Sequence, residues 1–60
     1  MAMSFEQWMN RVETIVYNEI EFYLGDLPDE DFRMNYDLGL TCKTMADIVL
    51  GNYYDQEEYF

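Results

Sequence analysis

The fold is decided by the stretch from Ser4 to Leu24, which reads SFEQWMNRVETIVYNEIEFYL. Its apolar residues recur at steps of three and four, the spacing of one face of an α-helix. They are Phe5, Trp8, Met9, Val12, Ile15, Val16, Ile20 and Tyr23. Ser4 is a favourable N-cap, and Gln7, three residues later, completes a capping box. Because Gly25 is suited to the position after a helix end, we predict one long amphipathic helix over about 4–24.

A second, shorter helix is predicted over about 28–38. Pro28 suits a first helical position, and the three acids that follow it lie beside the positive end of the helix dipole. Phe32 and Tyr36, with Met34 as a further candidate, are expected to face inward.

A third helix is predicted over about 42–51, between Thr41 as its N-cap and Gly51 as its stop. Its apolar residues are Met45, Ile48, Val49 and Leu50. The tail over 52–60 alternates aromatic and acidic residues, and it either extends the third helix or forms a loose end. We therefore predict an all-α fold in a single domain, 1–60, in which the two short helices fold back as a hairpin across the apolar stripe of the first.

The size and composition favour tight packing or association over chemical crosslinks. A chain of 60 residues buries only about 60% of the surface that its unfolded form exposes. Cys42 is the only cysteine and there is no histidine, so the chain has no internal disulfide and none of the usual zinc or haem ligand sets. Half of the residues are hydrophobic and 18% are aromatic. Tyrosine and tryptophan serve interfaces as well as cores.

The charge predicts which partners the chain binds. Thirteen acidic residues against three basic ones give a formal net charge of −10. Such a surface repels phosphate backbones and anionic lipids, so we expect no direct nucleic-acid or membrane binding. A basic protein surface is the expected partner. The sequence shows neither a signal-peptide pattern nor an apolar run of the roughly 20 residues that a membrane span needs, so a cytoplasmic location is expected.

Catalytic and metal-binding patterns are not found. Ser4 and Cys42 are the only serine and cysteine, and no histidine is available to activate them, so we expect no enzyme activity and no cofactor. The acids Asp26, Asp29, Glu30 and Asp31 suggest a calcium loop. They fail the EF-hand pattern, because the sixth position counted from Asp29 is Met34 where glycine is needed. A solvated acidic helix start is the simpler interpretation.

Glu19 is unusual because it falls near the middle of the apolar face of the first helix, between Ile15, Val16 and Tyr23. A carboxylate there must be paired, hydrogen-bonded or left unburied. Two alternatives remain open. Glu19 is paired inside the chain, with Arg33, Lys43 or a tyrosine hydroxyl, or this part of the stripe is open to a partner or a second copy.

The aromatic residues outside the main stripe allow two interpretations as well. Tyr17 and Phe22 lie at or beyond the edges of the stripe, and the tail from Tyr53 to Phe60 adds further rings. These rings either pack at helix ends or form a surface for association, and association explains why so short a chain carries so many of them.

One resemblance extends over most of the chain. A Trp8-bearing helix is followed by Leu27-Pro28-Asp29, then by Phe32, Tyr36, Gly39, Thr41 and Ala46. This arrangement resembles a group of short uncharacterised proteins of bacteriophages and prophages. The resemblance implies a phage source, and small acidic phage proteins often inhibit host enzymes, some by imitating the charge of DNA.

Our leading functional hypothesis is an acidic interaction protein, encoded by a phage, that blocks a basic nucleic-acid-binding surface of a host protein. The residues expected to bind this partner are Asp26, Asp29, Glu30, Asp31, Asp37, Asp55, Glu57 and Glu58, together with Tyr17, Phe22 and Glu19. The alternative is a structural homo-oligomer that assembles through the long helix and has no inhibitory role.

Overall fold

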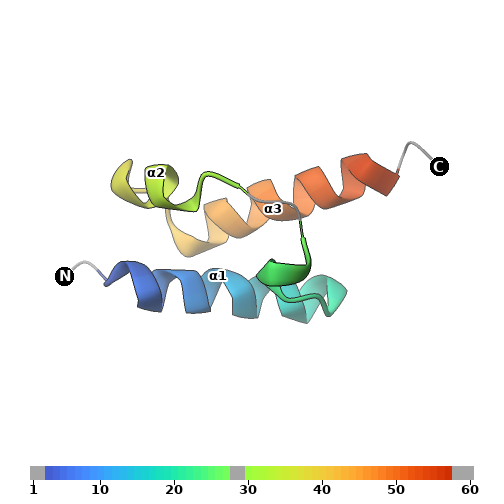
Figure 1. The fold of residues 1–60 in the computed structure, drawn as a ribbon, viewed down its shortest axis with the longest axis horizontal. Coiled ribbons are helices and arrows are strands. Elements are labelled where there is room, and N and C mark those ends of the chain that lie inside the picture. Colours follow the sequence, from blue (N-terminus) through green and yellow to red (C-terminus); the bar gives the residue numbers. More distant parts are fainter. Residues whose placement is uncertain (1–2, 28–29, 58–60) are drawn as a thin grey trace.

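The computed structural model describes residues 3–27 and 30–57, with side chains described as far as Asp55. Its elements are α1 (Phe5–Ile20), the 3-10 helix η1 (Leu24–Asp26), α2 (Phe32–Asp37) and α3 (Cys42–Glu57). The all-α prediction is confirmed. Figure 1 shows α1 and α3 side by side and pointing in the same direction, with α2 at the end where both begin. The chain reaches α2 by a long crossover that leads back from the end of α1.

The start of α1 is the predicted capping box. The Gln7 backbone N–H donates to the Ser4 Oγ at 3.1 Å, and the Gln7 Oε1 accepts from the Ser4 N–H at 3.3 Å. These two bonds satisfy amide groups that the first turn of a helix leaves without partners.

The predicted end of α1 near Leu24 is wrong. The helix ends at Ile20, and Glu21 adopts a left-handed conformation, φ 58°, while its N–H still donates to the Tyr17 carbonyl. The chain then turns back, and the Leu24 N–H donates to the Glu13 carboxylate at 3.1 Å. Leu24 packs against the core from the 3-10 turn. The local sequence favours a longer helix, but the packing of Leu24 on the core ends α1 at Ile20.

The second helix is shorter than predicted. It begins at Phe32, after Asp31 as its N-cap, and ends at Asp37. Residues 28 and 29, which were expected to start it, lie outside the described part of the chain. Phe32 and Tyr36 pack on the core as predicted, whereas the inward placement of Met34 is wrong, since its side chain is 53% exposed.

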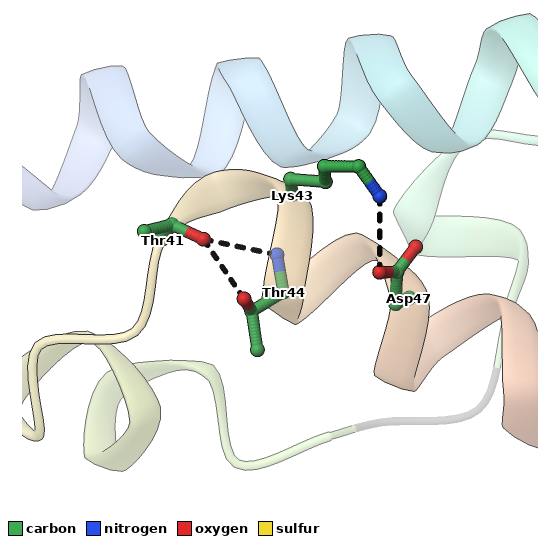
Figure 2. Close-up of polar contacts among 4 residues, drawn as sticks. All are labelled: Thr41, Lys43, Thr44 and Asp47. Atoms are coloured by element: carbon green, nitrogen blue, oxygen red, sulfur yellow. Dashed lines mark hydrogen bonds and ion pairs between the residues drawn. The ribbon is translucent and has the colours of Figure 1, made fainter.

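The third helix begins as predicted and is longer than predicted. Thr41 Oγ1 accepts from the Thr44 N–H at 3.1 Å, and the Thr41 hydroxyl donates to the Thr44 Oγ1 at 2.9 Å, as Figure 2 shows. The helix does not stop at Gly51 but continues to Glu57. Of the two alternatives for the tail, the helical extension therefore holds as far as residue 57.

The core lies between α1 and α3. Its buried side chains are Trp8, Val12, Val16, Met45, Ala46, Val49 and Leu50. The Trp8 indole N–H donates to the Leu40 carbonyl at 2.9 Å, and the Tyr36 hydroxyl donates to the Met3 carbonyl. These two bonds join the start of α1 to α2 and to the turn before α3.

Candidate interaction surface

Two of the basic residues form ion pairs with acidic residues of the same helix. Arg33 lies 3.4 Å from Asp37 on α2, and Lys43 lies 3.3 Å from Asp47 on α3; the second pair is drawn in Figure 2. Both pairs are four residues apart and largely exposed, so each contributes little to stability. Their effect on the surface is to neutralise Asp37 and Asp47 locally.

The acids of the crossover form the first part of the predicted surface. We use the name acidic crossover for Asp26, Glu30 and Asp31. Asp26 and Asp31 are exposed, and the Glu30 carboxylate accepts from the Asn52 amide on α3 at 2.8 Å. That bond places Glu30 against the second half of α3.

Asp55 lies beside this contact along α3. It is exposed and lies three residues after Asn52 on α3, and residues three apart on a helix are neighbours. The two acidic patches that sequence treated separately therefore adjoin at Asn52. Sequence gave no signal for this, because residues 30 and 52 are brought together only by the packing of the crossover on α3.

The remaining predicted acids are not joined to this surface by any described contact. Asp37 is at the end of α2, paired with Arg33. Asp29 and Glu58 lie outside the described residues, and of Glu57 only the backbone, as the last residue of α3, is described.

Glu19 is exposed. The internal ion pair considered for it is wrong, because Arg33 and Lys43 bind Asp37 and Asp47 instead. α3 packs on the line of Trp8, Val12 and Val16, and Glu19 lies beside that line. It borders a shallow groove between α1 and α3 whose other lining residues are Ile15, Lys43, Asp47, Leu50, Gly51 and Tyr54.

One group of aromatic side chains lies near the ends of α1 and α3. Tyr17 stacks on Tyr23 with ring centroids 4.9 Å apart, and Phe22 lies 5.8 Å from the Tyr53 ring. Tyr17 is 37% and Phe22 is 42% exposed, so both reach solvent, as a role in association requires.

Tyr23 was missed as a surface residue. The helical spacing assigned it to the apolar stripe, yet it is 56% exposed. The cause is the end of α1 at Ile20, since the helical projection does not apply to residues beyond it. No signal in the sequence marks Glu21 as the residue that turns left-handed.

Cys42 packs against the core at the start of α3. It is half-buried at the first position of α3, with its Sγ 3.9 Å from the Trp8 carbonyl oxygen. Within residues 3–27 and 30–57, no group of three or more histidine, cysteine or acidic side chains is arranged to hold a metal ion. No helix in the described part of the chain has the length and apolar character to cross a membrane. Comparisons with protein-family models, curated proteins and solved structures gave no significant match.

Proposed function

We propose that this chain is an interaction protein that binds a basic surface of another protein, one that itself binds nucleic acid, and thereby blocks it. The observation that carries the proposal is the Glu30–Asn52 hydrogen bond, which places Glu30 of the acidic crossover beside the part of α3 that carries Asp55. Acidic residues of two segments far apart in the sequence therefore lie near one another. In a chain with a formal net charge of −10, such a surface attracts a basic partner and speeds its encounter.

The dimensions of the molecule suit competition with nucleic acid. Duplex DNA presents about one negative charge per 1.7 Å of its axis. The described part of the molecule measures 42 × 20 × 16 Å, and its long dimension follows α1 and α3 (Figure 1). An inhibitor with this form covers a short segment of a nucleic-acid groove. A phage source, with a host protein as target, is part of this proposal.

A capture experiment tests the proposal. The immobilised chain is incubated with bacterial lysate at about 50 mM salt, below physiological ionic strength, so that screening is weak. We expect basic nucleic-acid-binding proteins to be retained and to elute as salt is raised. The captured protein, once purified, is expected to lose bound duplex DNA when the chain is added. Retention that salt does not change, or a captured protein that keeps its DNA, contradicts the proposal.

Matched variants locate the contact. D26N/D31N removes two charges from the acidic crossover, and E6Q/D47N removes two from exposed positions of α1 and α3 that are not among the predicted binding residues. Both pairs change the net charge equally, so a purely general attraction weakens equally in both. We expect D26N/D31N to lower affinity several-fold more than E6Q/D47N, measured by titration against the captured protein. Equal losses would show that the crossover is not the contact.

A homo-oligomer is the second candidate, favoured by exposed apolar side chains and by the groove beside Glu19. The middle of the apolar stripe of α1 is covered by α3 within the chain, so the part of the stripe that remains for such an assembly is at its edge, where Ile15 borders the groove with Tyr54. It predicts a mass by sedimentation that doubles with concentration and is indifferent to salt. A monomer at high concentration contradicts it.

A further inference from the structure

Tyr17 and Tyr23 form a stacked pair at the end of α1. Their ring centroids are 4.9 Å apart and their planes differ by 29°. They are 37% and 56% exposed respectively, so the pair is open to solvent. Aromatic faces carry negative electrostatic potential and attract cations.

Three acidic residues lie close to this pair, as their hydrogen bonds show. Glu13 lies one helical turn before Tyr17 and accepts from the Leu24 N–H, next to Tyr23, at 3.1 Å. The Glu21 N–H donates to the Tyr17 carbonyl at 2.8 Å, and the Asp26 N–H donates to the Tyr23 carbonyl at 2.9 Å. Each of these acids is therefore tied to a residue of the pair or to its direct neighbour.

At the other end of the molecule, two aromatic rings and a carboxylate lie around an arginine side chain, although these two rings are edge to face and not stacked. The Arg33 guanidinium carbon lies 5.1 Å from the centre of the Phe5 ring and 5.8 Å from that of Tyr36. Its Nε lies 3.4 Å from the Asp37 carboxylate. Two rings and a carboxylate thus bind an arginine side chain that the chain itself supplies.

The tyrosine pair has the same components, and the described basic residues lie elsewhere. Arg33 and Lys43 are paired with Asp37 and Asp47, and Arg11 lines a groove with Met3, Gln7, Asn10, Thr14 and Ile15. We infer that Tyr17 and Tyr23 are a docking site for an arginine side chain of the basic partner. This inference rests on the proposed function and names the contact that would give it specificity.

Arginine suits this site better than lysine. Its planar guanidinium stacks on aromatic faces while its N–H groups bind carboxylates, whereas a lysine ammonium is a compact, strongly hydrated charge. A second copy of this chain is a poor occupant, because two such ends repel each other.

The test uses two peptides of equal charge, hexaarginine and hexalysine, titrated into the full chain at low salt. A cation–π contact at an exposed site is worth about a two- to fivefold change in affinity. We expect hexaarginine to bind more tightly by roughly that factor. We also expect the ring-proton NMR signals of Tyr17 and Tyr23 to shift most.

Three variants separate the site from general attraction. In Y17L/Y23L the ratio of the two affinities is expected to fall to about one, and in Y17F/Y23F, which keeps the rings, it is expected to persist. Y54L removes an exposed tyrosine of α3 and is the matched control, with an unchanged ratio. If Y17L/Y23L fails to fold, the ring signals of the unaltered chain and the Y17F/Y23F ratio still decide.

The outcomes distinguish this inference from the function on which it rests. Equal, salt-dependent binding of both peptides, or an arginine preference that survives in Y17L/Y23L, overturns the arginine site and leaves the acidic interaction surface standing. Failure of both peptides to bind the unaltered chain at low salt overturns the two together.

Discussion

Trp8 shows what a single residue contributes to this fold. Its side chain is nearly fully buried, and its indole N–H is the polar group that links α1 to the turn before α3, through the Leu40 carbonyl at 2.9 Å. Its ring also lies 5.4 Å from that of Tyr36, edge to face. One side chain therefore joins three elements by burial, a hydrogen bond and ring packing.

Replacing Trp8 by Phe is expected to lower the free energy of unfolding by about 1–3 kcal/mol, because the Leu40 carbonyl loses its donor and the smaller ring leaves space in the core. Urea denaturation followed by circular dichroism measures the change. Tyr54→Phe, which removes a polar atom from an exposed ring, is the control and is expected to stay within about 0.5 kcal/mol of the original chain. A W8F chain as stable as the original would contradict the role of this hydrogen bond.

At the scale of elements, the glycines show which helix ends are specified locally. Gly39 follows α2 with φ 88°, a conformation that glycine adopts without strain and that commonly ends a helix. Gly51 lies inside α3, which continues to Glu57, and a Cβ placed there meets nothing within 4 Å. A glycine therefore does not end a helix by itself. α3 continues past Gly51, and Tyr53 just beyond this glycine packs against Phe22.

Gly51→Ala is therefore expected to stabilise the chain by about 1 kcal/mol, the difference in helix propensity between the two residues. Gly39→Ala is expected to destabilise it by about 1–2 kcal/mol, the cost of left-handed backbone for a residue with a Cβ. Thermal and urea unfolding measure both variants. Equal effects of the same sign would show that position 51 is not helical interior.

At the scale of the whole molecule, net charge opposes compaction. With a formal charge of −10 on 60 residues, the acidic side chains repel one another in the folded chain. The two described ion pairs are exposed, and each involves only neighbouring residues of one helix. Salt screens this repulsion over about 10 Å at 0.1 M.

We expect the free energy of unfolding to rise as sodium chloride increases from about 10 mM, where the screening length is near 30 Å, to physiological ionic strength. The D26N/D31N variant, with less charge, is expected to show a shallower rise. Stability that falls with added salt would indicate that the exposed ion pairs outweigh the repulsion.

Sequence alone determined the helical class, the capping box of Ser4 and Gln7, the start of α3 after Thr41 and most of the core residues. Each depends on residues within three or four positions of one another, so the interaction can be seen in the order of the chain. The tertiary structure decided the end of α1 at Ile20, the exposure of Tyr23, the parallel course of α1 and α3 and the Glu30–Asn52 contact. These features depend on contacts between segments that are far apart in the sequence. Many ways of packing the helices together are compatible with the same local sequence pattern, and the tertiary structure is the one that packs best.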